Sequence, residues 1–396
     1  MNICFVYDCE YPWDVRVEKI INSLYDHGHT VTLVARNKKR EPRFSQQQKC
    51  DIYRLPSSNN KVLNGIFNIT LFFNPIWIRN IFKVSRDTGS DVIIVRDLPL
   101  SGAAVFIGWL RKIPVIVDMA EPYPLTVRQR RFFEPFKLSH LITRNIAFSD
   151  LYEKVVLKFA SHIFVVCEEA KNRLKNLGAR SESVSIVHNT PDLKKFDNSL
   201  PDEKESYFNT SEYVILYTGI LIGGRGLEIA INAMSQVKTK NTSVKLYIIG
   251  SGKAEHDLKK QVSDLDLDDT VYFLGWIDND LLPGYINNCD VGILPFSNTQ
   301  HINNTIANKL FDFMAMSKSV ICSDVDPMYR IINQENCGYT FKADDAISLA
   351  EVIMQSFNDT SKNKLGENGY TSVVKKYNWS SDEKTLVSSV ESFFES

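Results

Sequence analysis

Apolar, β-branched runs alternate with amphipathic helical segments along most of this chain, and this alternation is the feature that most limits its possible folds. In the first half, the strand-like runs are residues 2–8, 29–36, 91–97, 113–119 and 162–167. Helical patterns at residues 15–28, 100–112 and 168–178 separate them. Continuous apolar strands between helices predict an α/β fold whose parallel sheet is covered on both faces.

The alternation lapses between about residues 190 and 212, where the sequence is polar and contains Pro191 and Pro201. A second series of strand-like runs then follows at residues 213–219, 244–250, 271–275, 290–295 and 319–324. A chain of 396 residues is too long for one ordinary core. We therefore expect two doubly wound domains, at residues 1–195 and 205–377, with a ligand cleft at the carboxyl ends of their strands.

The composition and a few local features argue against several functional classes. The net charge of −1 gives no whole-molecule field for nucleic acid. The seven cysteines are scattered without a CxxC pair, which argues against a zinc site and favours a reducing cytosol. The N-terminus shows no signal peptide. Residues 64–82 are the nearest approach to a membrane span, but Pro75 and Arg79 make a spanning helix improbable.

The segment at residues 303–324 predicts a helix that begins as an anion site. Leu310, Phe311, Met314 and Ala315 form one apolar stripe, and Asn308 stands where an N-cap belongs. The first amides of a helix have no intrahelical partner, and the helix dipole is positive there. Lys309 adds positive charge, and Asp312 follows one turn further in.

Two glycine-rich segments follow strands of the second half. Gly219, Gly223, Gly224 and Gly226 surround Arg225 before a helix, and Gly250 and Gly252 repeat the strand–glycine–helix arrangement. Glycines allow a backbone to approach a phosphate closely, and arginine supplies a permanent charge. An ordinary glycine-rich turn with a solvated arginine is the alternative. No GxGxxG fingerprint follows any strand, which argues against a dinucleotide dehydrogenase.

The order of these segments resembles glycosyltransferase family 4, whose members are retaining, nucleotide-sugar-dependent enzymes. The segments that carry the resemblance are residues 218–234, 246–252, 271–276, 289–296 and 308–324, with 12–36, 98–104, 116–124 and 187–196 in the first half. The resemblance implies an α/β GT-B fold of two Rossmann-like parallel-sheet domains with an inter-domain cleft. It also implies that a final helix, about 378–396, returns to the N-terminal, acceptor-binding domain, while residues 205–377 bind the donor.

The resemblance assigns roles to particular residues. Arg225 and Lys309 would stabilise the leaving diphosphate, Asp312 would hold the ribose hydroxyls, and backbone at Trp276 and Ile277 would receive the base. The remaining expected donor-binding residues are Gly219, Gly223, Gly224, Gly250, Gly252, Asn304, Thr305, Ile306 and Asn308. Cationic side chains can balance the departing charge, and no Asp-x-Asp ends a strand, so neither a metal nor a cofactor is expected.

The chain also departs from the family pattern. Asn304 stands where the family often has the first Glu of a pair, and Ile220 replaces an arginine. The N-terminal Asp-x-His-Asp/Glu pattern reads Asp118, Met119, Ala120 and Glu121, so alanine occupies the histidine position. Glu121 is placed to contact the acceptor, and Asp118 is the second candidate catalytic carboxylate of this half.

Residues 127–148 interleave basic and aromatic side chains, which is typical of a surface on anionic lipid headgroups. The candidate acceptor-binding or membrane-binding residues are Arg128, Arg130, Arg131, Phe132, Phe133 and Lys137. A basic flank of an acceptor-site helix is the alternative. For the apolar residues at 64–82, we leave open an extension of this surface or a core contact.

These observations predict a hexosyltransferase that moves sugar from a nucleotide-sugar to a glycan, lipid-linked in our interpretation, during surface polysaccharide synthesis. The expected location is cytoplasmic, at the inner face of the cytoplasmic membrane. A GT-B sugar-nucleotide epimerase and a catalytically silent partner subunit are the alternatives. The donor sugar, its base and the linkage are not encoded in readable motifs.

Overall fold

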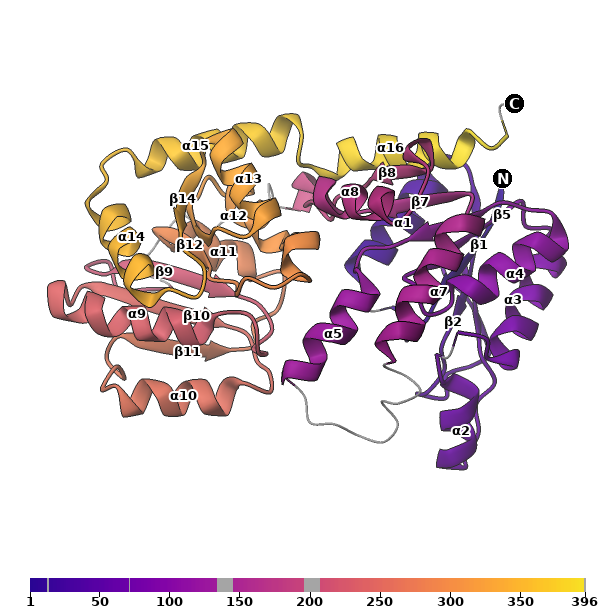
Figure 1. Ribbon diagram of the computed structural model, residues 1–396, viewed down its shortest axis with the longest axis horizontal. Helices are drawn as coiled ribbons and strands as arrows, with labels where there is room; N and C mark the ends of the chain where they lie inside the picture. Colours follow the sequence, from indigo (N-terminus) through magenta and orange to yellow (C-terminus); the bar gives the residue numbers. More distant parts are fainter. Residues whose placement is uncertain (13, 71, 134–144, 196–206, 395–396) are drawn as a thin grey trace. The chain divides into compact units, whose positions relative to one another are not determined.

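Two structural units make up the chain in the computed structural model, which describes residues 1–12, 14–70, 72–133, 145–195 and 207–394 (Figure 1). The first unit is Met1–His188 together with Asp382–Ser396, and the second is Asn189–Ser381. The chain therefore passes between the units at His188 and again at Asp382. The middle of the linker expected near residues 190–212 lies outside the described residues.

The first unit contains an eight-stranded sheet in the order β3-β4-β2-β1-β5-β6-β7-β8. Every neighbouring pair is parallel except β3 with β4. Its strands are β1 (Asn2–Tyr7), β2 (Thr30–Ala35), β3 (Phe44–Gln46), β4 (Asp51–Arg54), β5 (Val92–Arg96), β6 (Val115–Asp118), β7 (His162–Val165) and β8 (Val184–Ile186). Its helices are α1 (Val15–Asp26), α2 (Lys61–Asn68), α3 (Pro75–Asp87), α4 (Ser101–Arg111), α5 (Tyr123–Phe133), α7 (Ile146–Phe159) and α8 (Glu168–Asn176), with α16 (Trp379–Glu391) from Asp382 onward.

Local sequence explains where the first unit's functional edge begins. All five residues of β5 and all four of β6 are buried, as expected of central strands covered by helices on both faces. Helix α1 starts because the Asp14 carboxylate accepts hydrogen bonds from the amides of Arg16 and Val17. The strand order of the sheet changes direction between β1 and β5. The loops that follow these two strands therefore lead away from each other and leave room for side chains between them.

The apolar stretch at residues 64–82 forms two helices rather than one. Helix α2 ends at Asn68, and α3 begins at Pro75 after the Asn74 cap. Trp77 and Ile81 are fully buried, whereas Phe73 is exposed. A core contact, one of the two possibilities left open by the sequence, therefore accounts for Phe72 and the inner face of α3, whereas Ile66 and Ile69 are exposed. Within the described parts of the chain, no helix is long and apolar enough to cross a membrane.

The second unit contains a six-stranded parallel sheet in the order β11-β10-β9-β12-β13-β14. Its strands are β9 (Tyr213–Thr218), β10 (Val244–Ile249), β11 (Val271–Gly275), β12 (Val291–Leu294), β13 (Val320–Ser323) and β14 (Gly338–Phe341). Its helices are α9 (Leu227–Lys240), α10 (Glu255–Asp264), α11 (Leu282–Asn288), α12 (Asn308–Ala315), α13 (Asp326–Glu335), α14 (Ala346–Asn358) and α15 (Lys362–Lys375). The two doubly wound parallel sheets expected from the sequence are therefore both present.

The loop between β9 and α9 depends on glycine at one position above all. Gly226 has φ +70°, and a Cβ built there would lie 1.6 Å from the carbonyl oxygen of Pro295. Two separate constraints, left-handed backbone and lack of space, thus select glycine. Gly275 shares the first constraint, with φ +72°, but a Cβ there would meet nothing within 4 Å.

These two glycines give a matched test of how tightly the loop is packed. Gly275→Ala should lower the free energy of unfolding by about 1–2 kcal/mol, the cost of a left-handed alanine. Gly226→Ala should lower it by a further 1–3 kcal/mol or so, because the backbone near Pro295 must also move. Urea unfolding of both variants measures the difference. Equal losses would show that the Pro295 contact relaxes without cost.

Candidate functional site

The carboxyl edge of the second sheet gathers the residues expected to bind a nucleotide. The strand order changes direction between β9 and β12, and ligands of doubly wound sheets bind at such a point. The loop after β9 holds Gly219–Gly226, and the segment after β12 leads through a 3-10 turn, η4 (Ile302–Asn304), to α12. These two segments therefore begin on either side of the point where the sheet divides.

Arg225 is held at this edge by the segment that follows β12. Its guanidinium lies 5.2 Å from the ring centroid of Phe296, a cation–π distance. Phe296 is buried, and its carbonyl oxygen accepts a 2.7 Å hydrogen bond from Ser323 Oγ. The arginine is half-buried and lies against the ring of this buried phenylalanine.

Gly250 and Gly252 have a structural role beside the expected phosphate contact. A Cβ at Gly250 would lie 1.8 Å from the Gly219 carbonyl oxygen, and one at Gly252 would lie 2.1 Å from that of Leu221. The Gly219 and Leu221 amides donate to the carbonyl oxygens of Ile249 and Ser251, each at 3.0 Å. The loops after β9 and β10 thus pack backbone against backbone, which requires glycine whether or not a phosphate binds.

Helix α12 begins close to the predicted position, but its cap differs from the prediction. The N-cap is Ala307, which provides no side-chain hydrogen bond, and Asn308 is the first helical residue, with an exposed side chain. The expected capping role of Asn308 is therefore wrong. The predicted stripe of Leu310, Phe311, Met314 and Ala315 is buried as expected.

Lys309 and Asp312 form an ion pair with each other on the first turn of α12. Lys309 Nζ lies 2.9 Å from Asp312 Oδ2, and the two side chains are 31% and 17% exposed. A cation and a carboxylate are thereby presented together at one helix start. Asn304, where the family often has Glu, donates from Nδ2 to the Gln300 carbonyl oxygen at 2.8 Å.

The other expected donor residues differ in exposure. Trp276 is 65% exposed after β11, and Ile277 is half-buried beside it. Thr305 is half-buried and Ile306 buried, between η4 and α12. In the loop after β9, Gly223 is half-buried, while Gly224 is buried with φ +81°. Among these expected donor residues, Trp276 is the one that exposes a large apolar side chain.

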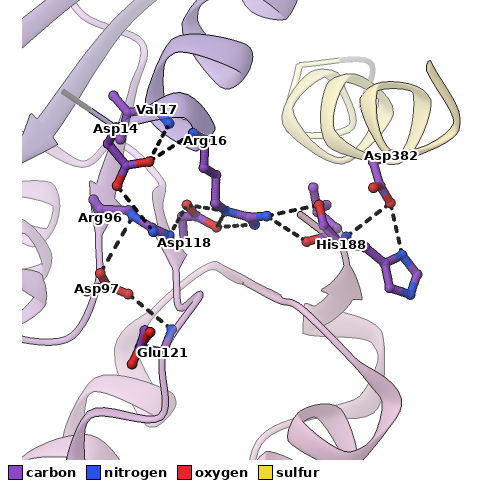
Figure 2. Close-up of polar contacts among 10 residues, drawn as sticks. Asp14, Arg16, Val17, Arg96, Asp97, Asp118, Glu121, His188 and Asp382 are labelled. Atoms are coloured by element: carbon purple, nitrogen blue, oxygen red, sulfur yellow. Dashed lines mark hydrogen bonds and ion pairs between the residues drawn. The ribbon is translucent and has the colours of Figure 1, made fainter. Parts of the chain in front are cut away.

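In the first unit, the residue expected to be catalytic at the end of β6 belongs to a buried ionic network (Figure 2). Asp118 is fully buried, and Arg16 Nη2 and Arg96 Nη1 donate to its carboxylate at 2.6 and 2.9 Å. Burial would raise the pKa of Asp118, but the two arginines outweigh it and hold that pKa below its usual value. The side chain has no exposed surface for a substrate, so we assign Asp118 a positioning role.

Two carboxylates at the same edge are accessible. Asp97 is 24% exposed, adopts φ +57° after β5, and its Oδ1 accepts a 3.3 Å hydrogen bond from the Glu121 amide (Figure 2). Burial, counteracted in part by Arg96, raises the pKa of Asp97 to about 7. Glu121 itself is exposed. The first unit therefore presents Asp97 and Glu121 to solvent, with Ala120 buried between Met119 and Glu121.

The same network extends to the residues at which the chain leaves and re-enters the unit. Arg16 Nη1 donates to the carbonyl oxygens of Val187 and His188 at 2.9 and 3.0 Å. Asp382 Oδ1 accepts from the His188 amide at 3.0 Å and lies 3.0 Å from His188 Nδ1. In Figure 2, the contacts continue from Asp118 through Arg16 to His188 and Asp382 of α16.

Sequence reasoning missed Arg16, Arg96, Asp97 and His188. Arg16 and Arg96 had a signal, since each is a charge inside or beside an apolar run in "DVRVEKII" and "VIIVRD". A charge in such a position needs a buried partner. Across the described residues, no three His, Cys, Asp or Glu side chains are grouped as metal ligands.

The expected membrane-binding segment is only partly described. Arg128 on α5 pairs with Asp150 on α7, so its charge is balanced within the protein. Arg130, Arg131, Phe132 and Phe133 belong to α5, but their side chains lie outside the described part of the structure. Lys137 also lies outside the described residues. The membrane-binding role of this segment therefore stays a prediction.

Comparison with known proteins matches both halves of the chain to sequence families. Residues 14–190 match the family described as glycosyl transferase 4-like domain, and residues 200–372 match glycosyl transferases group 1. An α-D-kanosaminyltransferase of Streptomyces kanamyceticus is 21% identical over 86% of this chain and 88% of its own. A glycosyltransferase of Methanocaldococcus jannaschii is 25% identical over 52% of this chain, a match that spans about half (53%) of that relative.

A further relative and two solved structures are also similar. The capsular polysaccharide biosynthesis glycosyltransferase CapM of Staphylococcus aureus is 24% identical over 57% of this chain and 60% of its own. Sucrose-phosphate synthase from Thermosynechococcus elongatus superposes with a TM-score of 0.80 at 17% identity, over 100% of this chain and 99% of its own. Anabaena HepE in complex with UDP-glucose gives 0.73 at 14% identity, over 99% and 100%. These structures confirm the predicted two-domain fold.

The buried network gives a stability prediction with a control in the same unit. Asp118→Asn should lower the free energy of unfolding by about 3–5 kcal/mol, because it leaves Arg16 and Arg96 buried without their main counter-charge. Asp87→Asn, which breaks the exposed Arg86–Asp87 pair, should cost less than about 1 kcal/mol. Urea unfolding followed by circular dichroism measures both. Similar small losses would mean that Asp14 and Asp97 replace Asp118 as counter-charges.

Proposed function

Since the chain belongs to the GT-B glycosyltransferases of the family 4 type, we propose that it transfers a hexose, with retention of configuration, from a nucleoside-diphosphate sugar to a lipid-linked glycan. The relative CapM, named for capsular polysaccharide biosynthesis, suggests that the product is a surface polysaccharide. The protein would act in the cytoplasm, at the inner face of the cytoplasmic membrane.

One observation supports the donor site most strongly. Arg225, backed by Phe296, and the Lys309–Asp312 pair at the start of α12 both follow the strands between which the second sheet divides. This edge supplies cations, helix amides and a carboxylate, which together suit a diphosphate joined to a ribose. The UDP-glucose bound by Anabaena HepE is a donor of this chemical class and the UDP bound by it is the nucleotide part of that donor, so UDP is the first nucleotide to test.

The proposed chemistry uses the chain's own cations. Breaking the bond between the anomeric carbon and the phosphate oxygen leaves negative charge on the diphosphate, which Arg225 and Lys309 would stabilise. Lys309 contacts Asp312 Oδ2, so Asp312 Oδ1 is available to accept from ribose hydroxyls while the pair remains formed. We propose that these groups suffice without a metal ion, and activity that persists in EDTA would support this.

On the acceptor side, the exposed Glu121 carboxylate is the proposed contact with the acceptor. Asp97 lies beside it, and its pKa of about 7 makes it able to exchange a proton near neutral pH. Asp118 would act indirectly, because its two arginines fix the end of β6 from which Glu121 extends. The family often has histidine at the position of Ala120. The acceptor or water would fill the space that the larger histidine side chain would otherwise occupy.

Nucleoside diphosphate release from a donor panel, with and without lipid-linked acceptors, separates this proposal from its alternatives. A transferase should release far more nucleotide when its acceptor is present. An epimerase would change the sugar nucleotide without an acceptor, and a silent subunit would do neither. Ala120 and Asn304 are the features that keep the silent subunit as an alternative.

Asp312→Asn should weaken UDP binding by about 10-fold to 100-fold, because each charge-assisted hydrogen bond to a ribose hydroxyl contributes about 1.5–3 kcal/mol. Asp264→Asn is the control, since Asp264 also pairs with a lysine of its own helix but is exposed. Isothermal titration calorimetry measures both affinities. If the two variants bind UDP equally, Asp312 lies outside the donor site.

Arg225→Ala should reduce turnover by about 10²–10³, the loss expected when one electrostatic donor to a transition state is removed. Arg225→Lys should recover part of it, because lysine keeps the charge and loses the planar fork. Arg180→Ala, at an exposed arginine of the first unit, controls for simple loss of charge. Full turnover in Arg225→Ala would remove this residue from the mechanism.

A further inference from the structure

Helices α4 and α7 pack side by side on the first sheet (Figure 1), and both carry large apolar side chains that are exposed among the described residues. These side chains include Phe106, Trp109, Leu110, Leu151, Val155 and Phe159. Trp109 is 75% exposed and Phe159 60%. A groove of about 1020 Å³ runs between the two helices, with Phe73 and Phe393 also in its wall. We refer to these six side chains and the groove as the α4–α7 surface.

Close packing beneath this surface shows that its exposure does not come from a loosely attached helix. A Cβ at Gly102 would lie 2.4 Å from Tyr152 Oη, and one at Gly108 would lie 2.2 Å from a Val115 methyl carbon. The Gly102 amide also donates to Tyr152 Oη at 2.5 Å. Helix α4 is thus pressed against α7 and the sheet, while the outer side chains have no cover among the described residues.

The charges around the α4–α7 surface are positive. Lys112 is the charged residue in the groove wall, and Lys154 and Lys158 are exposed on α7, with Lys158 Nζ 5.7 Å from the Phe159 ring centroid. Helix α4 contains no acidic residue. The acids of α7, Asp150 and Glu153, pair with Arg128 and Arg173. Among the residues that the structure describes, an apolar surface with lysines that have no acidic partner is therefore left.

This charge distribution selects one kind of partner. A second copy meeting the same surface about a twofold axis would place lysines opposite lysines, with no free carboxylate between them. An anionic bilayer provides phosphates for the lysines and an apolar layer for tryptophan and phenylalanine. We propose that the α4–α7 surface docks on an anionic lipid bilayer, with Trp109 and Phe159 entering the boundary between headgroups and acyl chains.

The proposal deepens the function proposed above and rests on it for its purpose, which is to bring the first unit to a lipid-linked acceptor. One end of the groove lies close to the acceptor-side carboxylates. Tyr152 Oη donates to the Pro99 carbonyl oxygen at 3.5 Å, and Pro99 follows Asp97 by two residues. Docking through α4 and α7 would therefore hold the edge that presents Asp97 and Glu121 near the lipid headgroups.

Vesicle co-sedimentation of the full chain tests the surface directly. At low salt, wild type should bind vesicles of phosphatidylcholine with 30% or so phosphatidylglycerol much better than pure phosphatidylcholine, because several lysines contribute. The double variant Trp109→Ser, Phe159→Ser should bind at least about 10-fold more weakly. The control pair is Ile347→Ser with Tyr370→Ser, which removes exposed apolar residues from the second unit and should bind as wild type.

The contribution of charge is tested with three lysines. Replacing Lys112, Lys154 and Lys158 by Ser should weaken binding and reduce its dependence on salt. Replacing the exposed Lys240, Lys364 and Lys375 of the second unit by Ser removes the same charge and should have little effect. Acyl-brominated lipids should also quench Trp109 fluorescence in wild type, with Trp109→Phe as the reference.

Equal binding of wild type and the Trp109, Phe159 double variant would overturn the proposal. Sedimentation velocity gives a second route to failure, since a wild-type dimer that the double variant converts to monomer would mean that another copy covers the surface. UDP binding without vesicles should be unchanged in the double variant. Vesicle binding without any sugar transfer would refute the proposed function alone, whereas transfer without vesicle binding would refute only the docking surface.

Discussion

A single buried carboxylate holds together the functional edge of the first unit. Asp118 has no exposed surface and receives hydrogen bonds from Arg16 of α1 and Arg96 of β5. Arg16 in turn binds the carbonyl oxygens at the end of β8, and His188 there binds Asp382 of α16. Removing one partner of such a network leaves charges buried without compensation, which costs far more than the net contribution of the intact pair. Five elements therefore depend on one side chain that never reaches a substrate.

Two neighbouring carboxylates beside Arg96 have opposite pKa shifts, because burial outweighs the arginine at Asp97 and two arginines outweigh burial at Asp118. Asp118, between two guanidinium groups, has a lowered pKa, so its contribution to stability is present above its ordinary pKa of 3.8 and is lost as the pH falls through its value in the folded protein. Asp97 has a pKa raised to about 7, so the folded protein binds the extra proton between about pH 4 and 7 and loses stability as the pH rises through that range. Environments that separate the pKa values of adjacent acids also separate their roles. Asp118 stays ionised and structural, and Asp97 can exchange a proton beside Glu121.

Local patterns predicted the sheets but could not predict this network. Strands such as β5, β6 and β9 are apolar along their whole length, and this property is visible in the sequence alone. Arg16 and Asp118 are 102 residues apart, so no periodicity connects them. The Lys309–Asp312 pair, three residues apart on one helix, could have been anticipated. The cap of α12 was misplaced because Asn has the better capping chemistry, whereas the buried Ile306 and Phe311 have the spacing of a hydrophobic staple around Ala307.

The two units present polar groups at the edges of their sheets in different ways. Both have a point at which the strand order divides, and both must present polar groups there without leaving them unpaired. The first unit fills the position beside β1 and β5 with paired charges and presents the side chains of Asp97 and Glu121 to solvent. The second unit uses glycines that bring the loops after β9 and β10 into backbone contact, which leaves helix amides and one backed arginine for a ligand. Backbone recognition suits the phosphates that all nucleotide-sugars share, and side-chain recognition can differ from one acceptor to another. On the proposed function, substitutions that change the acceptor should fall near Glu121, whereas packing alone requires glycine at Gly226, Gly250 and Gly252.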